Sequence, residues 1–187
     1  MFGKGEGIPS NPVTLVKGHT GPIYTVKFNN VGEYCMTGSE DRSVCLYNPH
    51  KNLMIKNYKN LHNYDVSCLD IAKDNSKFIT GGGDKTLILT DVVEGKTIRK
   101  YLGHNGRINS ITFNPENNVI ISGSYDTTVQ IWDNKSNSTH SIQTLRGFKD
   151  SVCRVYVRGF EIICASMDGS VRFYDIRNGL YTCDSIT

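Results

Sequence analysis

TGGGDKTLILTD (residues 80–91) combines three glycines, a Lys-Thr pair and a short apolar run, and its interpretation decides the fold. The glycines and the Lys-Thr pair are also elements of a phosphate-binding loop, G-x-x-x-x-G-K-[ST], which opens a helix. Here Asp84 stands directly before Lys85, where its carboxylate would repel a phosphate, and Phe78 replaces a glycine five residues before Gly83. The residues after Thr86 are typical of a strand. We therefore interpret the stretch as a turn between two strands, with the glycines serving the turn.

The same stretch recurs three more times, and Asp84 is the residue that aligns the copies. The corresponding residues are Asp41, Asp126 and Asp168, so the aspartates are spaced 43, 42 and 42 residues apart. A repeat of this period indicates an array of similar structural units. The copies are TGSEDRSVCLYN (37–48), TGGGDKTLILTD (80–91), SGSYDTTVQIWD (122–133) and CASMDGSVRFYD (164–175).

Each copy is preceded by a second marker, at GHTG (18–21), LHNY (61–64), GHNG (103–106) and GFKD (147–150). Further apolar runs connect the units at 53–58, 96–102 and 141–145. Short strands at regular spacing with Gly and Asp turns predict an all-β chain. No segment has a sustained 3.6-residue apolar period, so we expect almost no helix. We predict a flexible tail at 1–12 and repeats over 13–187, at about 18–50, 61–94, 103–137 and 147–179.

This pattern resembles the WD40 family, whose repeats carry Gly-His, a turn Asp and a terminal Trp-Asp and fold as four-stranded blades of a β-propeller. The resemblance covers residues 13–187 and implies four antiparallel blades. It also implies that a His, a Ser or Thr, an Asp and an aromatic residue form a hydrogen-bonded structural set in each blade. The matching residues are His19, Thr37, Asp41 and Tyr47; His62, Thr80 and Asp84; His104, Ser122, Asp126 and Trp132; and Asp168 and Tyr174.

The third set is complete, but Thr90 replaces the aromatic residue of the second, and Phe148 and Cys164 replace His and Ser in the fourth. We therefore expect Asp168 to keep only part of its partners and the fourth blade to be the least rigid. A His/Asp/Ser set also occurs in catalytic triads, but a set copied once per repeat indicates a structural role. We predict no catalytic residue, no metal site and no cofactor, and hence no enzyme.

The WD40 resemblance also implies a partner-binding rim, built from residues just after the His position and from the residue before each turn Asp. These are Pro22, Tyr24 and Glu40; Asp65, Ser67 and Gly83; Arg107, Asn109 and Tyr125; and Ser151 and Met167. Aromatic and arginine side chains dominate protein-binding hot spots, so the mixture fits protein partners.

Composition excludes several classes of partner. The net charge of +3 is spread along the chain and makes no dense basic stripe, so we expect no direct nucleic-acid binding. No stretch has the length of a membrane span, and residues 1–12 lack the apolar core of a signal peptide. The six cysteines form no C-x-x-C pair, so we expect reduced thiols and a cytoplasmic and nuclear location.

Four blades are fewer than the seven that the family usually has. We expect a leading outer strand at 13–17 and a further edge strand within GLYTCDSIT (179–187). Three interpretations remain open: the chain is part of a longer propeller, two copies associate through open blade faces, or four blades close as a small ring.

Short stretches narrow the resemblance further. GHTGPIYTVKFN (18–29), NPH (48–50), GGGDK (81–85) and YDIRNG (174–179) resemble the mitogen-activated protein kinase organiser family of WD-repeat proteins. That resemblance implies a non-catalytic scaffold for kinase-cascade or spliceosomal components. Alternatively, YDIR (174–177) resembles the W-D-x-R ending of substrate receptors of cullin ubiquitin ligases, with Tyr174 in the place of Trp.

Overall fold

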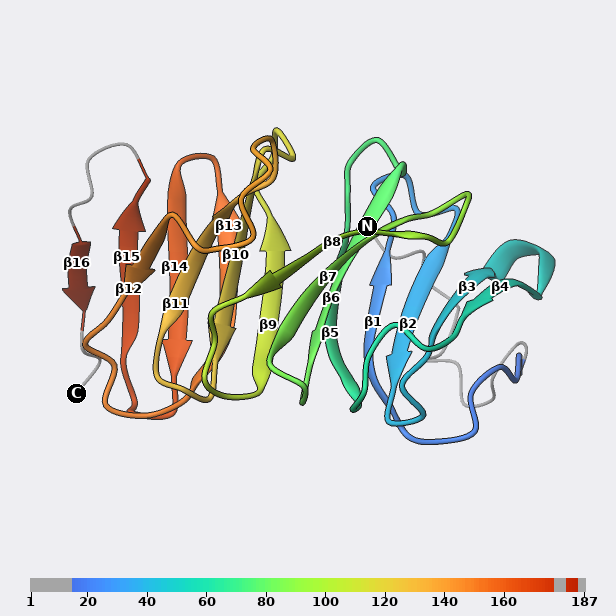
Figure 1. Cartoon of the computed structure of the whole chain (residues 1–187), viewed down its shortest axis with the longest axis horizontal. Helices are drawn as coiled ribbons and strands as arrows, with labels where there is room; N and C mark the ends of the chain where they lie inside the picture. Colours follow the sequence, from blue (N-terminus) through green and yellow to red (C-terminus); the bar gives the residue numbers. More distant parts are fainter. Residues whose placement is uncertain (1–14, 177–180, 185–187) are drawn as a thin grey trace, which may run out of the picture.

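The computed structural model describes residues 15–176 and 181–184, and within them the strands form four antiparallel four-stranded sheets (Figure 1). Consecutive strands are neighbours in every sheet, so each sheet is one blade made by one stretch of chain. The all-β prediction is confirmed. In blade order the strands are β1 (Ile23–Phe28), β2 (Cys35–Ser39), β3 (Val44–Asn48) and β4 (Leu53–Tyr58); β5 (Val66–Ile71), β6 (Lys77–Gly82), β7 (Thr86–Asp91) and β8 (Thr97–Leu102); β9 (Ile108–Phe113), β10 (Val119–Ser124), β11 (Val129–Asp133) and β12 (Gln143–Leu145); and β13 (Val152–Arg158), β14 (Glu161–Ser166), β15 (Val171–Asp175) and β16 (Tyr181–Asp184).

The connecting runs form the outermost strand of each blade, as β4, β8 and β12, and β16 is the expected edge strand paired with β15. Across the described residues the only helix is the three-residue 3₁₀ turn η1 (Pro49–Lys51), in agreement with the lack of helical periodicity. The prediction of a leading outer strand at 13–17 is wrong for the residues that the structure describes, because Leu15 to Lys17 form no strand. Its first two residues and the tail at 1–12 lie outside the described residues.

The turn after β6 follows Gly81, Gly82 and Gly83, the three glycines of the stretch 80–91. Its left-handed residue is Lys85, with φ 64°, and the equivalent Arg42, Thr127 and Gly169 share this conformation. The glycines of the stretch lie in or beside β6, where a Cβ on Gly82 would stand 1.9 Å from the Asp65 carbonyl oxygen. Gly82 therefore permits close approach of β6 to the segment before β5. Gly83 lies in the turn, which the hydrogen bond from Lys85 N–H to the Gly82 carbonyl closes, so the glycines do belong to the turn, but its left-handed residue is Lys85.

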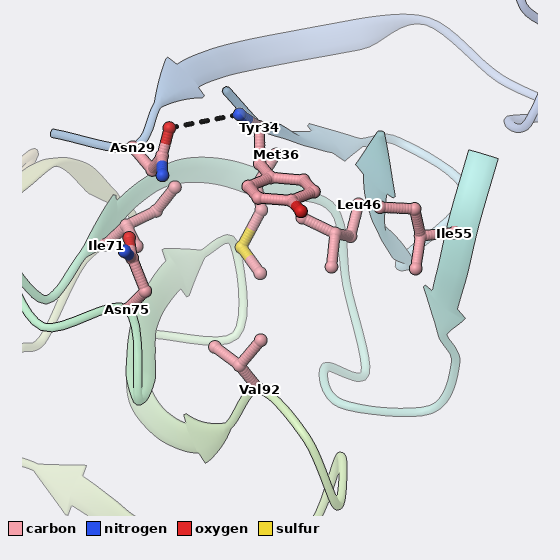
Figure 2. Close-up of a pocket in the computed structure, with 8 residues that line it drawn as sticks. All are labelled: Asn29, Tyr34, Met36, Leu46, Ile55, Ile71, Asn75 and Val92. Atoms are coloured by element: carbon pink, nitrogen blue, oxygen red, sulfur yellow. Dashed lines mark hydrogen bonds between the residues drawn. The ribbon is translucent and has the colours of Figure 1, made fainter. Parts of the chain in front are cut away.

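Apolar side chains fill the space between successive blades. Between blades 2 and 3, Trp132, Tyr101 and Ile108 are fully buried in one cluster. Because each inner blade is covered on both faces, its strands are apolar on both sides instead of alternating. The junction of blades 1 and 2 is less completely filled, and leaves an apolar cavity (Figure 2).

The arc of blades is open, with blades 1 and 4 at opposite ends (Figure 1). Val26 of β1 is 62% exposed, whereas the equivalent Leu69, Ile111 and Val155 of the other blades are 5%, 6% and 4% exposed. The three buried residues lie against the preceding blade, which blade 1 lacks. The structure is therefore that of a partial propeller, and a closed four-bladed ring is excluded.

Burial also governs the chemistry of the cysteines. Five of them, Cys35, Cys45, Cys68, Cys153 and Cys164, are free thiols, and the side chain of Cys183 lies outside the described residues. Burial raises the pKa of Cys68 and of Cys164 to about 12, so both remain protonated and unreactive at neutral pH. None of the described helical structure is long and apolar enough to cross a membrane.

Candidate protein-interaction rim

In blade 3, His104 joins a loop to two strands. Its Nδ1 lies 2.9 Å from Asp126 Oδ2, and its Nε2 lies 2.7 Å from Ser122 Oγ. Trp132 Nε1 donates to the same Ser122 oxygen at 2.8 Å. All atoms are satisfied when Nδ1 carries the imidazole proton and Nε2 accepts from the serine hydroxyl. The set is buried within the blade, so its serine is not presented to a substrate.

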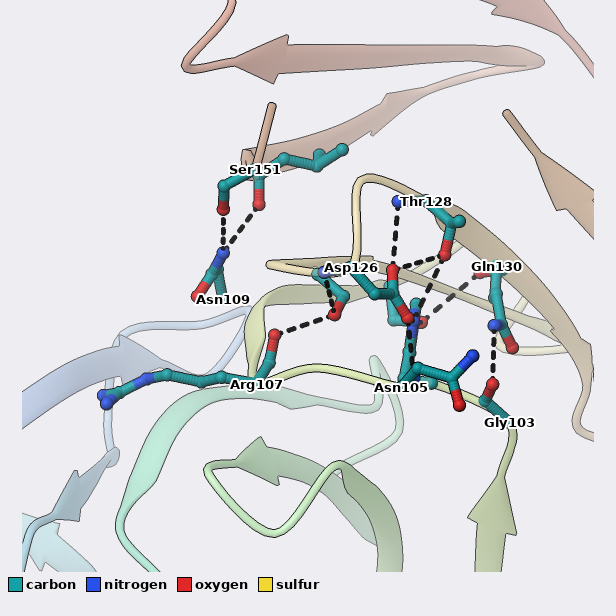
Figure 3. Close-up of polar contacts among 12 residues, drawn as sticks. Gly103, Asn105, Arg107, Asn109, Asp126, Thr128, Gln130 and Ser151 are labelled. Carbon is teal, nitrogen blue, oxygen red and sulfur yellow. Dashed lines mark hydrogen bonds and ion pairs between the residues drawn. The ribbon is translucent and has the colours of Figure 1, made fainter. Parts of the chain in front are cut away.

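The Asp126 carboxylate clamps the turn to the loop before β9 (Figure 3). It accepts from the backbone N–H of Asn105 at 2.8 Å, and from the N–H and hydroxyl of Thr128 at 3.0 and 2.6 Å. Burial alone would raise the pKa of Asp126, but the hydrogen bonds from His104 and Thr128 outweigh it and lower the pKa. The ionised carboxylate is therefore part of the folded structure.

Blades 1 and 2 repeat this arrangement up to the fourth position. His19 bridges Asp41 at 3.0 Å and Thr37 at 2.7 Å. His62 bridges Asp84 at 2.9 Å and Thr80 at 2.8 Å.

The two blades differ from blade 3 where Trp132 stands. In blade 1 that position is the buried Tyr47. In blade 2 it is Thr90, whose hydroxyl oxygen is buried with no hydrogen-bond partner among the described residues. In blade 2, His62 therefore makes the hydrogen bonds to Asp84 and Thr80, but the aromatic residue of the set is missing.

Blade 4 uses an arginine where the others use histidine. The guanidinium of Arg172 lies over the Phe148 ring, donates from Nη2 to the Gly147 carbonyl at 2.7 Å, and pairs with Asp168 at 3.6 Å. Asp168 also accepts from Lys149 N–H and from the N–H and hydroxyl of Ser170. The expectation that Asp168 keeps only part of its partners is therefore wrong.

Arg172 is the residue that sequence reasoning missed. In the repeat alignment it stands four residues after the turn Asp, where the other copies have Cys45, Ile88 and Gln130. Gln130 donates to the Gly103 carbonyl at 3.1 Å, the same loop position that Arg172 reaches in blade 4 (Figure 3). Two features of the sequence could have revealed this role: an arginine at position 172, and the replacement of the repeat histidine by Phe148. Tyr174 lies near Phe148, with ring centroids 6.4 Å apart.

The predicted rim residues are brought together in pairs by one backbone hydrogen bond that every blade repeats. The N–H of the residue before the turn Asp donates to the carbonyl of the third residue after the His position. The pairs are Glu40 to Pro22 at 2.9 Å, Gly83 to Asp65 at 3.2 Å, Tyr125 to Arg107 at 2.9 Å, and Met167 to Ser151 at 2.9 Å. This bond makes the two loops of each blade one surface.

Three rim side chains from different blades meet around Arg107. Its guanidinium carbon lies 5.5 Å from the Tyr24 ring centroid, and its Nη2 lies 2.7 Å from Asp65 Oδ2. The contact with Asp65 is an ion pair whose geometry departs from that of a hydrogen bond, since Asp65 Oδ2 has no aligned donor among the described residues. Figure 3 shows the Arg107 side chain directed away from the Asp126 clamp. Tyr24 and Arg107 remain exposed and can contact a partner.

Other predicted rim residues serve junctions between blades. Asn109 Nδ2 donates to Ser151 Oγ and to the Val152 carbonyl, both at 2.9 Å (Figure 3). Ser67 Oγ donates to the carbonyls of Gly81 and Ile108. Tyr125 and Met167, in contrast, are 67% and 68% exposed, and their side chains are available at the surface.

Comparison with known proteins identifies the family to which the chain belongs. A family model described as "WD domain, G-beta repeat" matches residues 10–48, 56–91 and 95–133, which is more than half of the chain. The chain belongs to the WD40-repeat family. Among the described residues no group of three or more His, Cys, Asp and Glu side chains is arranged to hold a metal ion.

Curated relatives include a WD-repeat protein, a pre-mRNA-splicing factor and a small nuclear ribonucleoprotein protein. The chain is 29% identical to a WD repeat domain-containing protein 83 homolog of Dictyostelium discoideum, over 88% of this chain and 59% of the relative. It is 27% identical to the pre-mRNA-splicing factor cwf17 of Schizosaccharomyces pombe, over 86% and 47%. It is 30% identical to the U5 small nuclear ribonucleoprotein 40 kDa protein of D. discoideum, over 94% and 50%. The chain thus spans about half the length of these WD40 relatives.

Solved structures agree with the propeller architecture. The structure of U3-55K superposes with a TM-score of 0.84 at 19% identity, covering 90% of this chain and 53% of the other. The RRP9 WD40 repeats superpose with a TM-score of 0.83 at the same identity. At this level of identity the likeness concerns the fold alone.

Proposed function

We propose that this WD40 protein is a non-catalytic scaffold that binds protein components of the pre-mRNA splicing machinery through its rim. The observation that carries the proposal is that Tyr24, Arg107 and Tyr125 are exposed on the rim, with the Arg107 guanidinium over the Tyr24 ring and the Tyr125 N–H bonded to the Arg107 carbonyl. Aromatic and arginine side chains at the centre of an interface supply most of its binding energy. The splicing factors among the relatives support this class of partner and a nuclear location.

Two finer alternatives from the sequence remain proposals. The first is a scaffold for kinase-cascade components, which would add a cytoplasmic location. The second is a cullin-ligase receptor that uses YDIR, but Arg177 of that motif lies outside the described residues. The three possibilities predict different sets of captured proteins, so one experiment distinguishes them.

Affinity purification from cells tests the rim. Wild-type protein, an Arg107→Ala/Tyr125→Ala double variant and a Lys73→Ala control would be compared, since Lys73 is exposed on the β5–β6 loop at the opposite edge. We expect splicing proteins with wild type and control, and their loss with the double variant while it remains folded at the temperature of the experiment, although loss of the Arg107–Asp65 ion pair lowers its melting temperature. Equal capture by the double variant contradicts the rim. A kinase set, or a ligase adaptor lost on Arg177→Ala, supports the corresponding alternative.

We also propose that a second copy of this chain covers the open face of blade 1 with its blade 4. The support is the exposure of Val26 and Phe28, whose equivalents in blade 3, Ile111 and Phe113, are buried by a neighbouring blade. Tyr156 is exposed at the other end of the arc, where the equivalent Asp70 of blade 2 is covered. Each end therefore presents a surface of the kind that blades use to contact one another.

Sedimentation tests this association. We expect a dimer for the wild type, a monomer for a Val26→Ser/Phe28→Ser variant, and a dimer for a Val31→Ser control, because Val31 is an exposed residue of the β1–β2 loop. A wild-type monomer at micromolar to millimolar concentration would contradict it.

A further inference from the structure

The cavity between blades 1 and 2 lies at the edge of the arc opposite the rim. It has a volume of about 270 Å³, and its walls include Met36 and Leu46 from blade 1 and Ile71 and Val92 from blade 2 (Figure 2). Ile55 extends one wall, and Asn29 is the polar side chain that lines it most deeply. The site is therefore an apolar hollow with few polar groups, the composition expected of a small binding pocket.

The fold does not require this cavity, because the equivalent junction between blades 2 and 3 is filled. Phe113 occupies there the position of Ile71, and is buried against Ile79 and Leu89. Asn134 occupies the position of Val92, and its Nδ2 donates to the Asn117 carbonyl at 2.7 Å. The first junction has the smaller Ile71 in place of phenylalanine, and Val92 in place of an asparagine that bonds a neighbouring loop, and it stays open.

Asn29 supplies an independent observation that points to a ligand. Its side chain is buried, with the residue 6% exposed, and its Oδ1 accepts from the Tyr34 N–H at 3.0 Å. Its Nδ2 has no hydrogen-bond partner among the described residues. Figure 2 shows this nitrogen turned away from Tyr34 and toward Ile71. A buried donor left unpaired is unfavourable, so an acceptor brought to it is favoured.

The third blade shows how such an asparagine is satisfied within a repeat. Asn114 stands at the position of Asn29, and its Nδ2 donates to Glu116 Oε2 and Asn118 Oδ1, both at 2.6 Å. Blade 1 has Val31 at the position of Glu116, and a valine side chain accepts no hydrogen bond. It has Glu33 at the position of Asn118, but Glu33 is exposed and makes no hydrogen bond to Asn29 Nδ2. The donor of Asn29 is thus left for an acceptor from outside the loop.

We propose that this cavity binds an aliphatic side chain of a partner protein's peptide segment, whose backbone carbonyl accepts a hydrogen bond from Asn29 Nδ2. The inference rests on the proposed scaffold function and adds a second site to it, on the edge opposite the rim. Apolar walls favour leucine or isoleucine over a charged side chain. An engineered apolar cavity of about 150 Å³ holds benzene, so the space here is sufficient for such a side chain.

Methyl NMR titration tests the proposal with defined probes. N-acetyl-leucine N-methylamide would be added to protein labelled at the methyl groups of Met36, Ile55, Ile71 and Val92. N-acetyl-glycine N-methylamide is the matched probe that lacks the aliphatic chain. We expect saturable shifts of the cavity methyls with the leucine probe, and at least a tenfold weaker response with the glycine probe. Equal responses, or no shift with the leucine probe at tens of millimolar, overturn the proposal.

Two variants separate the walls from the donor. Ile71→Phe copies the residue of the filled junction, so we expect it to keep the fold and to weaken leucine-probe binding at least tenfold. Asn29→Asp keeps the oxygen that Tyr34 uses and removes the donor, with the same expected weakening. Unchanged binding in Ile71→Phe overturns the site, whatever the stability of the Asn29 variant.

The rim variant distinguishes this proposal from the scaffold function itself. Arg107→Ala/Tyr125→Ala should leave the leucine-probe titration unchanged, because the rim and the cavity lie on opposite edges. If the rim variant abolished probe binding, the cavity would not be the site. Loss of splicing partners in the rim variant, with no response to the leucine probe in any protein, would support the scaffold and reject only the cavity.

Discussion

The guanidinium of Arg172 lies over the Phe148 ring, with its carbon 4.3 Å from the ring centroid. From this position it reaches both the Gly147 carbonyl and the Asp168 carboxylate. In blade 3, His104 performs the corresponding bridge between a loop and the turn Asp. In blade 4, Arg172 and the Phe148 ring therefore join the loop before the first strand of the blade to the turn Asp.

Replacement of Arg172 by alanine should destabilise the protein. The change leaves Asp168 without its cation and exposes one face of Phe148, so we expect a loss of about 2 kcal/mol in the free energy of unfolding. Chemical denaturation measures it, with Arg158→Ala as the control because Arg158 is an exposed residue at the end of β13. An effect no larger than that of the control would show that Arg172 does not hold the blade.

Replacement of Asp126 by alanine should cost stability without removing a chemical activity. The Asn105 and Thr128 donors would lose their acceptor, at about 1–3 kcal/mol for each group that stays buried and unpaired. Thermal unfolding measures the effect, and Asp133→Ala, at the end of β11, is the surface control. A variant of wild-type stability that had lost a measurable activity would support a catalytic role instead.

Acid should unfold the protein through its turn aspartates. Burial raises the pKa of Asp41, Asp84 and Asp126, but hydrogen bonds to the carboxylates outweigh it, so each folded pKa lies below the ordinary value. A lowered folded pKa stabilises the native state above the unfolded pKa of about 3.9, and this contribution is lost as the pH falls toward the folded value.

Urea denaturation between about pH 7 and about pH 3 measures this loss as a falling free energy of unfolding. In Asp126→Asn the dependence on pH should be shallower than in the wild type, because one of the coupled carboxylates is gone. Identical pH profiles for the two proteins would mean that Asp126 is not among the groups responsible.

Replacement of Thr90 by valine should be neutral or stabilising. The Thr90 hydroxyl is buried and has no partner among the described residues, and valine has nearly the same shape, so removal of the hydroxyl removes a desolvation cost of about 1 kcal/mol. Thr80→Val is the matched control on the neighbouring strand. The Thr80 hydroxyl bonds His62 and the Ile88 carbonyl, and its loss should destabilise. A destabilised Thr90→Val protein would reveal a partner for that hydroxyl.

The repeat pattern was enough to predict the strands and the loop contacts that recur. The connecting run at 53–58 coincides with β4. That His104, Ser122 and Asp126 meet was implied by the resemblance to the WD40 family, and the structure shows these contacts. The strands and their order depend on turn residues and on regular spacing along the chain, and both can be read from one sequence. The turn at Asp84 shows a limit of this prediction, because its left-handed residue is Lys85 and not a glycine, while Gly81 and Gly82 allow close approach to Ile108 and Asp65.

The sequence by itself determined the fold class, the number of blades and the family, because each blade is a local meander that repeats with a nearly constant period. Only the tertiary structure decided how Arg172 replaces a histidine, which rim side chains remain exposed, and where a junction between blades is hollow. Those outcomes depend on side chains about one repeat apart in the chain, such as Ile71 against Met36, or Asn109 against Ser151. Whether such side chains fill the space between blades is a matter of volume and direction in three dimensions, which no spacing along the chain encodes.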